Sequence, residues 1–104
     1  MTGWVYLFLA ALFEIGWALG LKYTDGFSRP LPTLLTVASM AASLTLLGLA
    51  VKTLPLGTAY AIWTGIGTAG TVALGVMLLG EPATALRVAC VGLILLGVAG
   101  LKLA

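Results

Sequence analysis

Residues 5–21 read VYLFLAALFEIGWALGL, an apolar run that contains a single carboxylic acid, Glu14. A helix rises about 1.5 Å per residue, so such a run covers most of a hydrocarbon core about 30 Å thick. A charged side chain at the centre of a bilayer costs about 2.5 to 3.5 kcal/mol on insertion scales. Acids in this position mark ion pathways and proton relays, so Glu14 is the first candidate for a functional residue.

The whole chain has the composition of a membrane protein. Of its 104 residues, 62% are hydrophobic and only 8% are charged, whereas an ordinary soluble domain has about 25% charged residues. The formal net charge of +2 is too small to indicate a nucleic-acid partner. The sequence has no histidine and a single cysteine, Cys90, so we expect no metal site, no internal disulfide and no cofactor.

Charged residues and prolines divide the chain into four apolar stretches. We expect membrane-spanning helices at about residues 2–21, 31–51, 57–79 and 84–103. Together they would form one four-helix transmembrane domain over residues 1–104. Asp25-Gly26 is a typical turn sequence, and Pro30 suits the first turn of the second helix. The loops are too short to hold a globular active site, so we expect a protein that is not an enzyme.

The positive charges outside the spans favour neither orientation in the membrane. Four spans place both termini and the second loop on one side. That side carries Lys52 and Lys102, whereas the opposite side carries Lys22, Arg29 and Arg87. Lysine and arginine normally set the orientation by their excess in cytoplasmic loops. With so even a distribution, insertion in both orientations and an orientation set by another feature both stay open.

One copy of the chain would enclose too little volume to shield a carboxylate from lipid. Two copies would enclose a shared cavity with two Glu14 side chains near the midplane. If the copies insert in opposite senses, the dimer acquires a two-fold axis in the membrane plane, as inverted repeats do within one chain. The last helix carries Gly92, Gly97 and Gly100, small residues of the kind that line membrane helix contacts, and is the expected dimer face.

Polar and aromatic residues fall on helix faces that could meet Glu14. Trp17 lies three residues further along the same face of the first helix. Tyr60 and Trp63 share one stripe of the third helix, and Ser43 lies on the second. If these faces converge, N–H and hydroxyl donors would surround the carboxylate, and the aromatic rings would favour a cation. Aromatic residues are also typical of membrane interfaces, and a serine can bond its own helix backbone, so these alternatives stay open.

Residues 65–70 read GIGTAG, which has the G-x-G-x-x-G spacing of dinucleotide-binding loops. Here the pattern lies inside an apolar span without the preceding strand that such a loop requires, so nucleotide binding is excluded. Glycine in a helix costs about 0.5 to 1 kcal/mol relative to alanine. We interpret Gly65 and Gly67 as a hinge or a close-packing point in the third helix.

Three parts of the sequence resemble the small multidrug resistance family of four-helix bacterial membrane transporters. They are residues 13–18 (FEIGWA), residues 21–23 with 25–29 (LKY and DGFSR), and residues 54–67 (LPLGTAYAIWTGIG). The resemblance covers essentially the whole chain. Trp17, three places after Glu14, and Gly57-Thr58 are similar to the guanidinium-exporter branch. Ala11 is a departure, because that branch often has glycine one turn before the acid.

The resemblance implies an all-α protein that works as an antiparallel, dual-topology homodimer and exchanges guanidinium for protons across the bacterial inner membrane. Glu14 would bind substrate and proton in turn. It further implies a substrate-site shell of Trp17, Ser43, Tyr60 and Trp63, and a hinge at Gly65 and Gly67. A carboxylate binds the rigid N–H donors of guanidinium in bidentate fashion. Since protons and guanidinium compete for the same oxygens, inward proton flow can drive the cation outward.

Other functions stay open on the sequence alone. The first is a multidrug exporter of lipophilic quaternary ammonium cations, which would use the same mechanism in a wider pocket. The second is a small structural membrane subunit, in which Glu14 would pair with a basic residue of a partner chain. A channel is less favoured, because one acid and short loops offer no evident gate.

Overall fold

The computed structural model describes residues 2–104, which form four α-helices joined by short loops. Helix α1 spans Thr2–Tyr23, α2 spans Pro30–Ala50, α3 spans Leu56–Leu79 and α4 spans Ala85–Leu103. Each helix begins and ends within two residues of the bounds expected from the sequence. All four are long and apolar enough to cross a membrane, which confirms the expected all-helical fold class.

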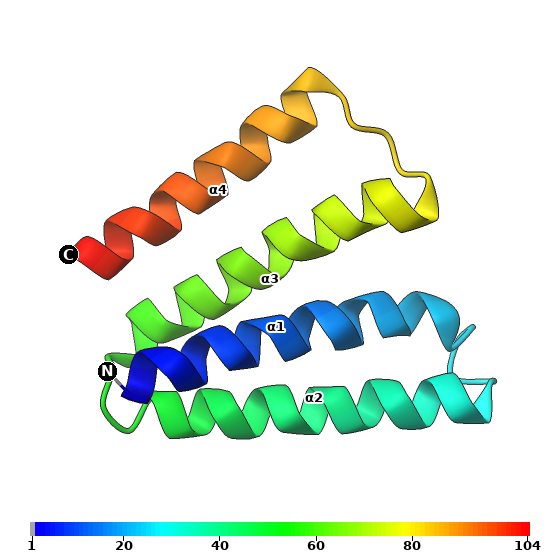
Figure 1. Cartoon of the computed structure of the whole chain (residues 1–104), viewed down its shortest axis with the longest axis horizontal. Coiled ribbons are helices and arrows are strands. Elements are labelled where there is room, and N and C mark those ends of the chain that lie inside the picture. Colours follow the sequence, from blue (N-terminus) through cyan, green and yellow to red (C-terminus); the bar gives the residue numbers. More distant parts are fainter. Residues whose placement is uncertain (1) are drawn as a thin grey trace.

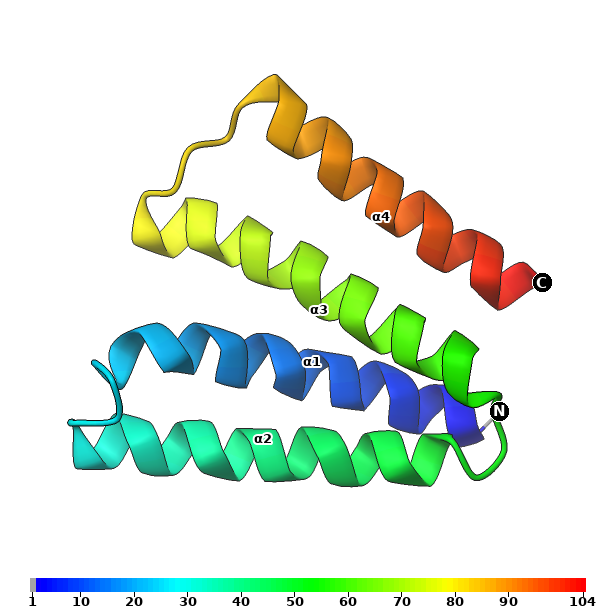
Figure 2. The same cartoon turned by 180° about the vertical axis from the view of Figure 1, so that it is seen from behind.

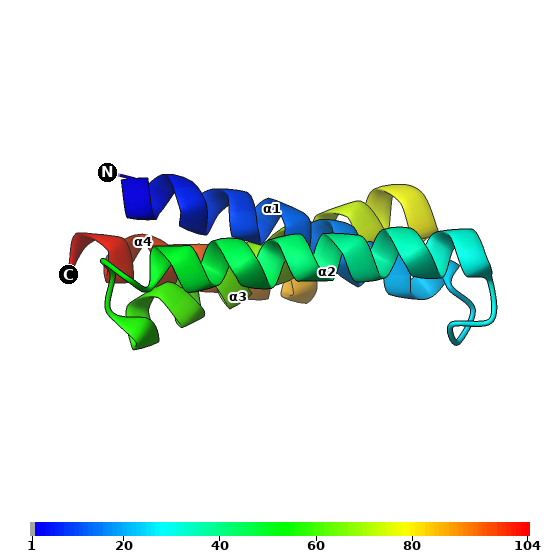
Figure 3. The same cartoon turned by 90° about the horizontal axis from the view of Figure 1, so that it is seen from below.

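The helices lie side by side in a flat slab, in the order α2, α1, α3, α4 (Figure 1). Figure 2 shows the same order from the opposite side, and Figure 3 shows the slab edge-on. The principal extents are 40 × 34 × 16 Å, so the slab is only slightly thicker than one helix of about 10 to 12 Å. The start of α1 and the end of α4 lie at the end of the slab that also holds the α2–α3 loop. Helices α1 and α3 therefore run parallel to each other.

Local sequence accounts for the helix ends. Pro30 occupies the first turn of α2, where its missing N–H would have no partner within the helix. Asp25, Gly26 and Phe27 all adopt left-handed backbone, with φ angles of 49°, 69° and 66°, and they reverse the chain between α1 and α2. Gly80 ends α3 at a φ of 70°, a conformation that glycine adopts without the steric penalty of a Cβ atom.

The buried core lies among α1, α2 and α3. Its residues are Leu7, Ala10, Ala11, Leu47, Ala50, Ala59, Ile62 and Trp63. Alanine supplies half of this set, and small residues let helix backbones approach closely in a membrane, where lipid offers no hydrophobic drive for helix association. Close packing therefore holds these three helices together.

Helix α4 packs differently, since it neighbours only α3 and none of its residues is buried. It packs closely against Gly65 of α3, where a Cβ atom would meet the side chains of Val98 and Ile94. Lys102 reaches beyond α3. Its ammonium group lies 5.1 Å from the centre of the Trp4 ring of α1, within the range of a cation–π contact.

Candidate functional site

Glu14 lies near the middle of α1, twelve residues after its start and nine before its end. At about 1.5 Å per residue, these separations are about 18 Å and about 14 Å, which places the acid at the depth of the hydrocarbon core. Its Oε1 atom is buried and has no hydrogen-bond partner among residues 2–104. A buried polar atom without a partner is costly, so this oxygen is a candidate for binding a ligand or a proton.

The carboxyl group of Glu14 packs against α3 at Gly67. A Cβ atom at position 67 would overlap Oε1 and the carboxyl carbon of Glu14, so a larger residue fits only if the acid moves. The next residue, Ile15, lies in the same way over Gly70. Close packing is therefore confirmed at Gly67, as it is at Gly65 beside α4. Helix α3 is continuous through both glycines, and the hinge stays a prediction.

A cavity of about 200 Å³ lies beside this carboxyl group, between α1 and α3. It is lined by Glu14, Ala18, Gly67, Thr68, Thr71 and Val72. Pockets for drug-sized ligands typically measure about 300 to 1,000 Å³, so this space suits a smaller ligand. The carboxylate would attract a cation, and the threonine hydroxyls can accept hydrogen bonds from its N–H groups.

Ser43 and Trp63 meet each other in the core. Trp63 Nε1 donates to Ser43 Oγ at 3.0 Å, and Ser43 Oγ donates to the carbonyl oxygen of Ala10 at 2.7 Å. These bonds connect α3, α2 and α1 one helical turn before Glu14. The alternative that Ser43 bonds its own helix backbone is wrong, because its acceptor belongs to the neighbouring helix.

Ser39 makes the equivalent contact one turn earlier along α2. Its Oγ atom donates to the carbonyl oxygen of Phe13 at 2.9 Å. Phe13 immediately precedes Glu14, so the serine face of α2 holds the backbone of α1 in position directly beside the acid. This face positions the carboxyl group through the main chain.

Tyr60 and Trp17 are placed differently from Ser43. The Tyr60 side chain is 55% exposed, and its ring centre lies 5.5 Å from that of Trp63. Trp17 Nε1 is buried, and no atom of residues 2–104 accepts a hydrogen bond from it. Within this part of the chain, none of the four predicted shell residues hydrogen-bonds to the Glu14 carboxyl group. Their role around the substrate stays a prediction.

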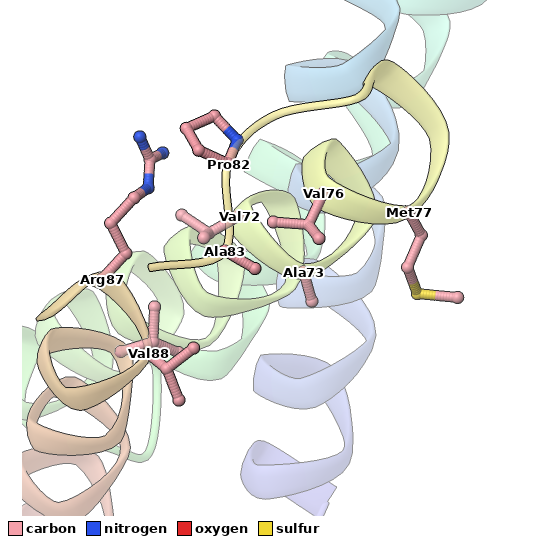
Figure 4. Close-up of a pocket in the computed structure, with 9 residues that line it drawn as sticks. Val72, Ala73, Val76, Met77, Pro82, Ala83, Arg87 and Val88 are labelled. Carbon is pink, nitrogen blue, oxygen red and sulfur yellow. The ribbon is translucent and has the colours of Figure 1, made fainter. Parts of the chain in front are cut away.

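The cavity between α3 and α4 has a different character. It measures about 300 Å³ and is lined by Val72, Ala73, Val76, Met77, Pro82, Ala83, Arg87, Val88 and Val91. Figure 4 shows that the valines and alanines form its walls, with Arg87 beside Pro82. Because Arg87 is the one charged residue in this lining and is positive, the surface disfavours a cation. The candidate cation site is therefore the cavity at Glu14.

Thr68 and Thr71 were not among the residues predicted from the sequence. Their spacing offered a signal, because Thr64, Thr68 and Thr71 recur at helical intervals on one face of an otherwise apolar span. The parallel packing of α1 and α3 is what brings this face to Glu14.

Four apolar spans, with an acid near the middle of the first one beside a small cavity, define a multi-pass membrane protein with a candidate intramembrane ion-binding site. The chain belongs to the Small Multidrug Resistance protein family, whose profile matches residues 2–94. The resemblance seen in three parts of the sequence is thereby confirmed over nearly the whole chain.

Relatives in this family match the chain from end to end. A guanidinium exporter of Yersinia pseudotuberculosis is 56% identical over 101 residues, covering 97% of each chain. Guanidinium exporters of Escherichia coli O6:H1 and Salmonella typhimurium are 55% and 54% identical over 100 residues, covering 96% of this chain and 95% of each relative. The names of the family and of these relatives indicate a transporter rather than an enzyme.

Proposed function

We propose that this protein exports guanidinium ion and small guanidinyl cations across the bacterial inner membrane in exchange for protons. The observation that carries the proposal is the Glu14 carboxyl group, which has a buried, unpaired oxygen beside a cavity of about 200 Å³ at mid-membrane. The name shared by the relatives at 54% to 56% identity supports guanidinium as the substrate.

The chemistry of the site suits this cation. Guanidinium is planar, and two of its N–H groups match the two oxygens of a carboxylate. Thr68 and Thr71 line the same cavity, and a threonine hydroxyl can accept a hydrogen bond from a further N–H group. Trp17 Nε1 has no acceptor within the described chain and is available to donate to the carboxylate. Tyr60 is exposed toward the surroundings of the bundle, where a ligand or a second copy of the chain can reach it.

Exchange follows from competition for the Glu14 oxygens. Binding of guanidinium displaces the proton from the carboxyl group, and protonation in turn releases the cation. If the empty, unprotonated protein converts slowly between its inward-open and outward-open states, each outward cation is matched by inward protons. Inward proton flow then drives guanidinium export.

A second copy in the opposite orientation would complete the transporter. Two copies of the flat slab would enclose the space that one slab leaves open beside α3, and would bring two Glu14 side chains into one cavity. Helix α4 has no buried residue, so its surface is available for this contact. Within the dimer, the hydrogen-bonded pair Ser43 and Trp63 would support the site from the core of α1, α2 and α3. Gly65 and Gly67 would let α3 bend when the cavity opens to the opposite side of the membrane.

The test of this function is the substitution Glu14→Gln in purified protein reconstituted into liposomes. Glutamine keeps the size of the side chain but cannot exchange a proton, so guanidinium-driven proton flux should fall to the level of empty liposomes. Asp25→Asn is the matched control, because it also removes one carboxylate but lies in the α1–α2 loop. Coupled flux that survives Glu14→Gln would refute the proposal.

Lipophilic quaternary ammonium cations are the second candidate substrate, because the matching family is named for small multidrug resistance. Competition binding separates the two possibilities. Guanidinium, whose N–H groups match the two oxygens of the Glu14 carboxylate, should bind in preference to a bulky tetra-substituted ammonium ion, which has no N–H group to donate. The opposite order of affinity would assign the protein to quaternary ammonium export.

A further inference from the structure

The cavity between α3 and α4 has no part in the proposed exchange, and its walls suit a ligand from the lipid bilayer. This α3–α4 groove measures about 300 Å³, and every residue that lines it except Arg87 is apolar. Val72 lies seven residues before the end of α3, and Val91 lies six residues after the start of α4. At about 1.5 Å per residue, the groove reaches about 10 Å from the helix ends toward the centre of the membrane.

Arg87 is the one charged residue of this lining, and it lies where a spanning helix meets the lipid headgroups. It is the third residue of α4, and its exposed side chain extends beside Pro82 (Figure 4). Glu81, the nearest acid in the sequence, belongs to another surface. Its carboxyl group lies over Gly75 and lines the cavity between α1 and α3 together with Lys22. Among residues 2–104, the groove lining therefore offers Arg87 no carboxylate as a partner.

The alternative occupant of the groove is a second copy of the chain, and its charges do not suit Arg87. A copy in the opposite orientation would bring its α2–α3 loop and the end of its α4 to the membrane surface where Arg87 lies. Within the described residues, the charged side chains at that end of the slab are Lys52 and Lys102, both positive. Like charges placed together disfavour a contact. Charge complementarity therefore favours an anionic occupant.

We propose that the α3–α4 groove binds one anionic phospholipid, with an acyl chain between the two helices and the phosphate group on Arg87. An acyl chain is the hydrocarbon that a bilayer supplies at the depth of the groove. The planar guanidinium group of Arg87 matches two phosphate oxygens through parallel N–H···O bonds. Basic pockets between transmembrane helices bind anionic headgroups in this way. The bound lipid fills the space beside α4, a helix that has no buried residue of its own.

The test of the headgroup contact is the substitution Arg87→Gln. Full-length protein in detergent is titrated with phosphatidylglycerol or with phosphatidylcholine of the same acyl chains, and bound lipid is counted by native mass spectrometry. The affinity for phosphatidylglycerol should fall about fivefold, or about 1 kcal/mol, which is the usual contribution of one basic residue near an anionic surface. The affinity for phosphatidylcholine should change less. Arg29→Gln is the matched control, because it removes an exposed arginine from the α1–α2 loop at the same end of the slab.

The test of the acyl-chain contact is the substitution Ala73→Phe, which places a ring in the groove and leaves the charge unchanged. Both lipids should lose affinity. Ala38→Phe makes the same change at an exposed position of α2 and should bind lipid as the wild type does. Glycerol phosphate has the phosphate group without the acyl chains, so it should not displace the bound lipid. If Ala73→Phe does not fold, Ala73→Leu provides the same measurement with a smaller side chain.

The remaining outcomes would overturn the proposal. Equal losses in Arg87→Gln and Arg29→Gln would mean a general attraction of lipid to a positive surface. Unchanged affinity in Arg87→Gln, or in Ala73→Phe, would remove the headgroup contact or the groove. Displacement by glycerol phosphate would make Arg87 a site for phosphate alone, and a monomeric Ala73→Phe variant would assign the groove to a second copy. The inference is independent of the proposed function, because neither Arg87 nor Ala73 lines the Glu14 cavity.

Discussion

Helices α1, α2 and α3 bury residues against one another within one chain, whereas helix α4 has no buried residue. The first three share a buried core and two serine bonds that cross between helices, from Ser43 to Ala10 and from Ser39 to Phe13. No residue of α4 is buried. Membrane helices associate through close packing and polar contacts, because lipid is as apolar as their side chains. The difference indicates that the first three helices hold the site, and that α4 is available to a second copy.

The glycines of the two regions show the same contrast. At Gly67 a Cβ atom would overlap the Glu14 carboxyl group, and at Gly65 it would meet α4. At Gly92, Gly97 and Gly100, no other helix of residues 2–104 comes within 4 Å of the place where a Cβ atom would stand. Glycine at positions 65 and 67 of α3 is thus required by contacts inside the chain, whereas Gly57 at the start of α3 is not. No contact within one chain requires glycine in α4, but close contact with a partner helix would require it.

The largest effect is expected for Gly67→Ala. The added methyl group would displace the Glu14 carboxyl group, and overpacking of this kind costs about 1 to 3 kcal/mol, or roughly a 5- to 150-fold loss of guanidinium affinity. Isothermal titration calorimetry on purified protein measures the guanidinium affinity. Gly92→Ala adds the same methyl group to α4, where the chain leaves open space, and should keep the wild-type affinity. Equal losses in both variants would remove the contrast between the two regions.

A smaller effect is expected for Ser43→Ala on stability. This substitution removes the bond to α1 and leaves buried Trp63 Nε1 without its acceptor, so the free energy of unfolding should fall by about 2 kcal/mol. Ser39→Ala is the matched control: it removes a single bond at a less buried position and should cost about 1 kcal/mol. Denaturation in mixed detergent micelles measures the free energy of unfolding of the two purified variants. A larger loss for Ser39→Ala would contradict the central role given to the Ser43 bonds.

The smallest effect is expected for Gly97→Leu, which tests whether α4 is the dimer face. A Cβ atom at position 97 meets no other helix of the described chain, so folding should be unchanged, but a close helix contact in the dimer would be disturbed. We expect dimer dissociation in lipid to become about tenfold easier, equivalent to about 1.4 kcal/mol. Gly48→Leu makes the same change at an equally open position on α2. If Gly48→Leu dissociates the dimer and Gly97→Leu does not, the face lies on α2.

The spans and their ends could be predicted because their causes are local. Pro30 restricts the backbone wherever it stands, Gly80 permits the left-handed conformation that ends a helix, and apolar runs of about 20 residues cross a bilayer in any tertiary arrangement. The sequence also identified Glu14, since the cost of an acid in lipid does not depend on its neighbours. The acceptor of Ser43 could not be predicted, because a serine on a membrane helix can bond its own backbone or that of any helix beside it.

By itself, the sequence determined that this protein spans the membrane four times and carries an acid at mid-membrane, since both follow from the transfer of side chains into lipid. Only the tertiary structure decided which residues surround that acid. Gly67 and Thr71 lie beside Glu14 because α1 and α3 pack in parallel at one register. That register is set by small side chains fitting together across two helices, so the spacing of residues within either helix alone does not predict it.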